Sequence, residues 1–220
     1  MVWMIFILVM VASYIVQATL RSRMDRYGRV ATSMNGAQIA KMMLEQNGIY
    51  DVGITCISGT LTDHYNPQTR TVNLSQDVYN GYNLAAAAIA AHECGHVIQH
   101  VTGYAPLKLR TAAVPLVTLA SKSVQWVLLL GIVILQFTPV MLWLGIALFG
   151  LSTAFSFITL PVEVNASQRA VAWLNTANIT DSTTTAYAHD ALKWAAYTYV
   201  IAALGSLATL LYYIGLARRN

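Results

Sequence analysis

The sequence predicts an α-helical membrane protein with four transmembrane helices and a small α+β domain beside the bilayer. Hydrophobic residues make up 56% of the 220-residue chain and charged residues only 10%, whereas soluble domains carry about 25% charged residues. Several uncharged stretches reach the roughly 20 residues that one membrane-spanning helix needs. Residues with short helix and strand patterns gather between the first and second of these stretches, which indicates the small domain.

The first element is a transmembrane anchor at residues 1–20. Residues 2–20 carry no charge, and the basic cluster RSRMDRYGR follows at 21–29. A secretory signal peptide has the opposite order, with basic residues before the apolar core and a small-residue cleavage site after it. We therefore expect an uncleaved anchor whose N-terminus lies outside the cell.

The second element is the small α+β domain at residues 21–110. Residues 33–47 have the pattern of a helix, and residues 52–57 have that of a strand. A β-hairpin is expected at 61–75, where the turn sequence NPQTR separates LTDHY from TVNLS. A further helix is expected at 83–103, because asparagine at its start can cap it and glycine can end it.

The remaining elements form a transmembrane hairpin, a connecting segment and a last span. The hairpin is expected at 111–160, because residues 123–162 carry no charge and QFTP at 136–139 is typical of a turn. The segment 161–194 follows, and its first part, LPVEVNASQRAVAWL, has the pattern of a helix. Residues 195–217 form the last span.

The orientation follows from the basic residues. Four spans place the segments 21–110 and 161–194 on the same side of the membrane. All lysines and arginines except Lys122, Arg218 and Arg219 lie in these two segments. The positive-inside rule therefore predicts that this side is cytoplasmic, although the two C-terminal arginines oppose that orientation.

The clearest chemical motif is HECGH, in the helix expected at 83–103. His92 and His96 are four residues apart, so their side chains share one helix face and can chelate one zinc ion. Glu93 can lie beside the metal and take a proton from a water molecule that zinc activates. A coincidental match on a buried helix is the alternative, but histidine is uncommon and the helix pattern is clear.

A third zinc ligand is required, because catalytic zinc takes three protein ligands and a water molecule. His100 continues the spacing, but a straight helix places it about 12 Å along the axis from His92, too far for one ion. Glu163 lies just beyond the hairpin, where the chain returns to the same side. We expect His92, His96 and Glu163 to hold one Zn²⁺, which makes the small domain zincin-like and of gluzincin type. The alternative role of Glu163 is a charge that marks the membrane boundary.

The stretch 63–100 resembles the signature of the bacterial neutral zinc metallopeptidase family typified by the YugP proteins, and the resemblance extends over nearly the whole chain. EVNAS, which begins at Glu163, is also similar to the ExxAD element of the HtpX and CAAX-prenyl membrane proteases. Ser167 stands where those proteases have aspartate, which leaves the partner of one zinc-binding histidine unassigned. Cys94 stands where we expect an aliphatic residue, and we interpret it as a packing residue.

The resemblance implies a multi-pass zinc metallopeptidase of the bacterial cytoplasmic membrane that hydrolyses peptide bonds, with Glu93 as general base. Because Glu163 lies at the end of a span, we expect membrane or membrane-proximal proteins as substrates.

TVNLS at 71–75 could offer an open strand edge to a substrate or be an ordinary hairpin strand. A role for His64, at the surface or in a substrate cleft, stays open. Four residues are candidates for stabilising the oxyanion: Arg169, His189, Tyr197 and Tyr199.

Two other function classes compete with the peptidase. One is a zinc-stabilised membrane scaffold or adaptor without proteolytic turnover, and Glu93 counts against it because a structural zinc site needs no base. The other is a small transporter with Lys122 as its intramembrane charge, which a single buried charge disfavours. The net charge of +4 is too small and scattered to indicate a nucleic-acid partner. The sequence indicates no particular oligomeric state.

Overall fold

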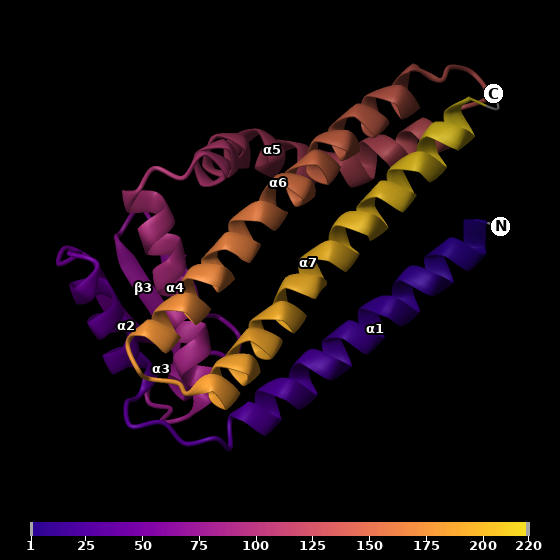
Figure 1. Ribbon diagram of the computed structural model, residues 1–220. Coiled ribbons are helices and arrows are strands. Elements are labelled where there is room, and N and C mark those ends of the chain that lie inside the picture. The colour runs from indigo at the N-terminus through magenta and orange to yellow at the C-terminus, as the bar shows by residue number, and fades with distance from the viewer. Residues whose placement is uncertain (1, 219–220) are drawn as a thin grey trace.

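The computed structural model describes residues 2–218. Four of the described helices are long and apolar enough to cross a membrane, which confirms the predicted number: α1 (Val2–Tyr27), α5 (Ala105–Val133), α6 (Val140–Thr176) and α7 (Ser182–Ala217). Helices α6, α7 and α1 run side by side, and α5 packs against α6 (Figure 1). The start of α1 and the end of α7 lie at the same end of this bundle, away from the sheet (Figure 1).

The small domain consists of three helices and one sheet at the other end of the bundle (Figure 1): α2 (Gly36–Gln46), β1 (Gly53–Ile57), β2 (His64–Asn66), β3 (Thr71–Ser75), α3 (Gln76–Tyr79) and α4 (Leu84–Val101). The strand order is β1-β3-β2, with β1 parallel and β2 antiparallel to β3. The predicted hairpin is therefore confirmed.

The strand order decides between the two interpretations of TVNLS, in favour of an ordinary hairpin strand. The TVNLS strand, β3, lies in the centre of the sheet and pairs on both sides, so it offers no open edge. The sequence shows the hairpin partner of β3, but the parallel partner β1 joins it only through tertiary packing. The outer edges belong to β1 and β2.

Side-chain caps fix where α2 and α4 begin. The side chain of Asn35 accepts a hydrogen bond from the backbone of Gln38, whose own side chain accepts one from the backbone of Asn35. Asn83, the cap predicted for α4, accepts a hydrogen bond from the backbone N–H of Ala86. Each cap satisfies an N–H group that has no partner within its helix.

Alanines let α4 pack closely at the centre of the small domain. Its first half carries six buried alanines, at positions 85–88, 90 and 91. The domain core around them also contains residues of α2, β3 and the adjoining ends of α6 and α7. Helix α4 is therefore a buried core helix of the small domain, and it is not among the four helices suited to cross a membrane.

The membrane helices are longer than the sequence predicted. Helix α6 continues through Pro161, where we expected one helix to end, and α7 begins at Ser182 instead of residue 195. Helix α5 likewise starts at Ala105 instead of residue 111. A proline removes one backbone hydrogen bond without ending a helix whose neighbouring turns remain paired and packed.

Helix α6 is longer than one membrane crossing requires. Its 37 residues extend about 55 Å, whereas the apolar core of a bilayer is about 30 Å thick. The C-terminal part of α6, with Glu163, packs against α4 of the small domain.

Polar contacts join α1 to α7 near the small domain. The Tyr27 hydroxyl donates a 2.7 Å hydrogen bond to Asp190, and Nε of Arg23 lies 3.2 Å from the same carboxylate. The ring of Tyr27 also stacks on Tyr187. These contacts attach the N-terminal anchor to the rest of the bundle.

Lys122 is exposed on α5, beside a groove of about 310 Å³ that Val114 and Phe155 help to line. Its side chain is not enclosed between the helices. This position does not support the transporter alternative, which needs a charge in the interior of the bundle.

Candidate metal centre

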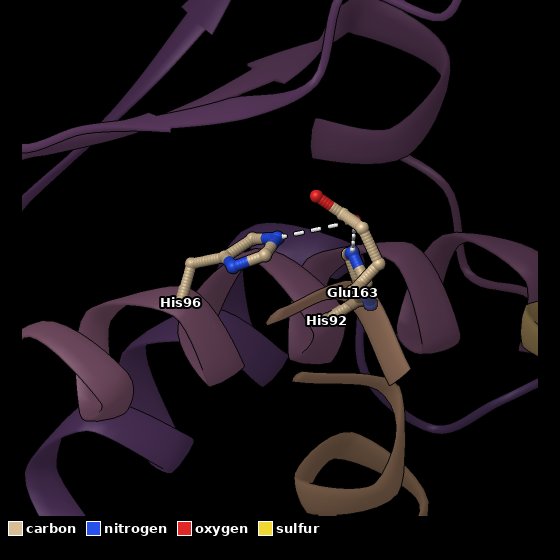
Figure 2. Close-up of side chains that lie close together, drawn as sticks. All are labelled: His92, His96 and Glu163. Carbon is tan, nitrogen blue, oxygen red and sulfur yellow. Dashed lines mark ion pairs between the residues drawn. The ribbon is translucent and has the colours of Figure 1, made fainter. Parts of the chain in front are cut away.

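Helix α4 presents two imidazoles side by side. His92 and His96 lie one turn apart, with ring centroids 4.8 Å apart and ring planes at 85° (Figure 2). Their side chains are only 15% and 12% exposed. Two largely buried imidazoles on one helix face can ligate the same metal ion.

Glu163 of α6 closes the group from the opposite side, and Figure 2 shows its carboxylate between the two rings. Its Oε2 atom lies 3.4 Å from Nε2 of His92 and 3.6 Å from Nε2 of His96. One ligand atom from each residue lies within 4.8 Å of the others. The sequence predicted this combination, and the structure brings the three side chains together.

The spacing of these atoms fits a tetrahedral ion. Two ligands bonded at about 2 Å to one tetrahedral zinc ion lie about 3.3 Å apart, close to the separations of the two nitrogens from Oε2. Two imidazoles and one carboxylate are also a ligand set that zinc accepts in catalytic sites. The three residues therefore fit a zinc ion.

Close packing of α4 against α6 allows Glu163 to reach the histidines. Gly95 lies between the two histidines, and a Cβ added there would be 2.7 Å from the backbone oxygen of Ala166. No Cβ atom is tolerated that close to a backbone atom, so only glycine fits without movement of α6. The glycine of HECGH thus sets the distance between the two ligand-bearing helices.

Ser167 orients the ring of His92. Its Oγ lies 3.1 Å from Nδ1 of His92. When Nε2 faces a metal ion, Nδ1 carries the ring proton and donates a hydrogen bond to Oγ. This hydrogen bond fixes both the tautomer and the direction of the ring. Ser167 thus provides the partner of a zinc-binding histidine that the sequence left unassigned.

Gln99 does the same for His96 and links the two helices. Its Oε1 lies 3.1 Å from Nδ1 of His96. Its amide nitrogen donates to the carbonyl of Val162 at 2.7 Å and to the side chain of Asn165 at 3.0 Å. Because both amide hydrogens go to α6, the amide oxygen must face His96.

Glu93 lies beside the three-residue group without belonging to it. It is 8% exposed, and its Oε2 accepts a 3.0 Å hydrogen bond from the backbone N–H of Tyr65 on β2. A carboxylate held in this way is oriented but keeps lone pairs that can accept a proton. The position suits a general base better than a metal ligand.

The electrostatics of the pocket favour a positive charge. Burial by itself would lower the pKa of His96, but hydrogen bonding to Glu163 and the negative charge of Glu93 outweigh it and raise that pKa above its usual value. The same two carboxylates would attract a metal cation.

Cys94 faces away from the candidate centre. Its thiol is fully buried and lies 3.6 Å from the carbonyl oxygen of Ala40 on α2. Burial, together with the charge of Glu93, raises the pKa of this thiol. Cys94 is therefore a packing residue, as the sequence analysis proposed.

One of the four oxyanion candidates lies beside the centre. Tyr199 of α7 is close enough to Glu163 and Glu93 to interact with them electrostatically. Of the others, Arg169 donates to Asn165, Tyr197 packs against Trp194, and His189 is exposed.

Two further histidines lie outside the ligand group. His100 is exposed and hydrogen-bonded to Tyr65. His64 is exposed at the sheet edge, 2.7 Å from the carbonyl of Thr62. His100 is not part of the ligand group, as the length of the helix between His92 and His100 predicted.

Two residues that contact the centre are not among the predicted site residues. One is Gln99, although its position three residues after His96 places both on one helix face. Tyr65 carried no signal, because its contact with Glu93 comes from the backbone, which any residue except proline provides.

Comparison with known proteins covers the whole described chain. A family described as "Putative neutral zinc metallopeptidase" matches residues 2–218. The protein named "Putative membrane protease YugP" from Bacillus subtilis (strain 168) is 39% identical over 217 residues, and the match covers 96% of both chains. No solved structure matches this chain.

Proposed function

Since the chain belongs to the neutral zinc metallopeptidase family, we propose that it is a membrane-embedded, zinc-dependent endopeptidase in which His92, His96 and Glu163 bind one zinc ion. The observation that carries this proposal is the convergence of these side chains with Glu93 beside them but outside the ligand group. Within residues 2–218 the group has three members, as in catalytic sites that keep one position open.

The alternative of a zinc-stabilised scaffold explains less of this arrangement. Structural zinc sites are usually closed by four protein ligands and need no neighbouring base. Here a largely buried glutamate is held next to the group by a backbone N–H. A buried carboxylate costs free energy unless it is paired, so its retention beside the site suggests a chemical role.

The protein residues divide the work of peptide hydrolysis. A bound zinc ion supplies Lewis-acid polarisation and makes water acidic enough to act as a nucleophile near neutral pH. Glu93 accepts the proton of the attacking water and delivers it to the leaving amine. Ser167 and Gln99 hold the imidazole rings in the direction that ligation requires.

The edge strand β2 is the proposed docking site for the substrate backbone. It packs against α4, and Tyr65 at its centre contacts Glu93. An extended peptide that adds to the outer edge of β2 would lie alongside the general base. This replaces the expectation that TVNLS would offer the edge.

The proposed substrates are membrane or membrane-proximal proteins, because Glu163 lies on the continuation of a membrane helix. A purified protein in liposomes should cleave chains tethered to the same membrane faster than soluble unfolded chains. Equal rates for the two kinds of substrate would contradict this preference.

The central test compares wild type with Glu93→Gln. The substitution keeps the shape of the side chain but removes the base. We therefore expect zinc content to stay the same while cleavage falls roughly 10²–10⁴-fold, the contribution typical of general base catalysis. Zinc can be measured by elemental analysis and cleavage with a quenched fluorescent casein or membrane substrate.

The matched control is Glu45→Gln, on the exposed face of α2, where Lys41 lies 3.9 Å away. This variant should keep both zinc and activity. Full activity of Glu93→Gln would rule out the proposed mechanism, and zinc binding without cleavage in wild type would favour the scaffold.

A further inference from the structure

Tyr65 and His100 form a hydrogen-bonded pair that the proposed hydrolysis does not use. The phenolic oxygen of Tyr65 lies 2.8 Å from Nδ1 of His100, and the ring centroids are 5.8 Å apart. Tyr65 belongs to the edge strand β2, and His100 belongs to the last turns of α4. The pair therefore bridges the proposed docking strand and the helix that carries the zinc motif.

The pair has a fixed position relative to the reacting groups. The backbone N–H of Tyr65 donates to Oε2 of Glu93. His100 follows His96 by four residues, which places it on the same helix face about 6 Å further along the axis. Both members thus lie about one helical turn from the candidate metal centre.

A role in stability explains little of this contact. His100 is exposed and Tyr65 is half-buried, and a single neutral hydrogen bond near the surface adds little to folding. The exposed position leaves the pair accessible to a bound chain. It also means that His100 can be replaced, and the Tyr65 hydroxyl removed, without unfolding the protein.

The pair presents one donor and one acceptor to its surroundings. A neutral imidazole has one N–H donor and one acceptor nitrogen. A phenol has one O–H donor and one oxygen that can accept through either of two lone pairs. Their mutual hydrogen bond uses one donor and one acceptor, so one of each remains whichever tautomer His100 adopts. Burial raises the pKa of Tyr65, which keeps the phenol protonated.

The backbone of one extended residue is the complementary ligand, because its N–H donor and its C=O acceptor point to the same side of the chain. We infer that the Tyr65–His100 pair binds the backbone N–H and C=O of one substrate residue about two residues from the cleaved bond. The distance follows from the helix rise of about 6 Å and the advance of an extended chain of about 3.3 Å per residue. The inference rests on the proposed peptidase function and adds a contact that favours extended peptides of sufficient length.

The test uses quenched fluorescent peptides that are shortened one residue at a time from either end. Tyr65→Phe removes the hydroxyl but keeps the backbone N–H that holds Glu93, and His100→Ala removes the imidazole. Each should lower kcat/KM about tenfold on the full-length peptide, mainly through KM. On peptides too short to reach the pair, each should match wild type.

A double variant and a control variant separate a binding pair from general damage. Because the two side chains act as one unit, Tyr65→Phe combined with His100→Ala should lose no more than either single variant. The control is Tyr50→Phe, since Tyr50 is 80% exposed and precedes β1 at the opposite edge of the sheet. It should behave as wild type on every peptide.

Equal losses on full-length and shortened peptides, or unchanged kcat/KM in both single variants, would overturn the inference. Fluorescence anisotropy can measure how tightly the Glu93→Gln variant binds the uncleaved peptide, which tests the pair without catalysis. Adding Tyr65→Phe to this variant should weaken binding about tenfold. If wild type cleaves no peptide, the peptidase proposal fails, and this binding experiment alone still decides whether the pair contacts peptides.

Discussion

At the scale of single residues, the direction of each imidazole depends on a neutral partner at Nδ1. Ser167 contacts His92 at 3.1 Å, and the amide oxygen of Gln99 contacts His96 at the same distance. Neither partner is charged, so within residues 2–218 the carboxylates at the centre are Glu163 and Glu93. The negative charge of the site is thus concentrated where a cation would lie and on the proposed base.

Removal of one partner should weaken metal binding without abolishing it. We expect Ser167→Ala to lower zinc affinity about tenfold, the lower end of the 10–100-fold range for such contacts, because a hydroxyl is a weaker partner than a carboxylate. Competition with a chromogenic chelator measures the affinity.

Ser156→Ala is the matched control for this substitution, because Ser156 lies on the same helix and its hydroxyl donates to the carbonyl of Ser152 within that helix, at 3.1 Å. It should bind zinc as wild type does. If Ser167→Ala binds zinc equally well, the hydrogen bond to His92 does not orient the ring.

At the scale of elements, the crossing of α4 and α6 assembles the centre. Helix α4 supplies His92, His96 and Glu93, and α6 supplies Glu163 and Ser167. Buried alanines and Gly95 let the helices approach, and the amide of Gln99 donates to the carbonyl of Val162 on α6 at 2.7 Å. Because the ligands lie on two helices, the distance between these helices determines whether the site can form.

Gly95→Ala should separate the two helices and impair the centre. The added Cβ would be 2.7 Å from a backbone oxygen that cannot rotate away, so α6 must shift and carry Glu163 with it. We expect a loss of about 1–3 kcal/mol in stability from overpacking and at least a tenfold loss in zinc affinity, measured by thermal unfolding and chelator competition.

Gly150→Ala provides the comparison within α6, since a Cβ at Gly150 would meet no atom within 4 Å. This variant should keep its zinc affinity, and its stability should stay the same or rise, because alanine favours helices more than glycine does. The same zinc affinity in both variants would show that the helix distance does not control the site.

At the scale of the whole molecule, the bundle separates the small domain from the chain ends. The labelled ends lie away from the sheet (Figure 1), and four helices are suited to cross the membrane. The basic residues favour a cytoplasmic small domain. Arg218 lies at the opposite end, after α7, and Arg219 lies outside the described residues.

The two cysteines allow this orientation to be measured. Cys56 is exposed on β1, whereas Cys94 is buried and its raised pKa keeps the thiol protonated. A membrane-impermeant maleimide should label inverted membrane vesicles once per chain and leave intact spheroplasts unlabelled. Cys56→Ser should remove the labelling, and labelling of intact spheroplasts would show that the small domain faces outward.

Features that depend on short stretches of the chain could be predicted from the sequence. Apolar runs predicted four spans because the bilayer excludes unpaired polar groups, and asparagine predicted the start of α4 through a local cap. The spacing of His92 and His96 follows from the helix repeat. Even the position of Glu163 near the histidines could be predicted, because a hairpin must return the chain to the same side of the membrane.

The tertiary structure alone decided how distant segments meet. The contacts of Ser167 with His92 and of Gln99 with Val162 join residues 75 and 63 positions apart. No local pattern encodes them, because they depend on how closely α4 and α6 pack. The same packing keeps α6 helical through Pro161, and the pairing of β1 with β3 leaves the edge to β2. Local spacing thus determined which side chains could act, and packing between helices determined which of them meet.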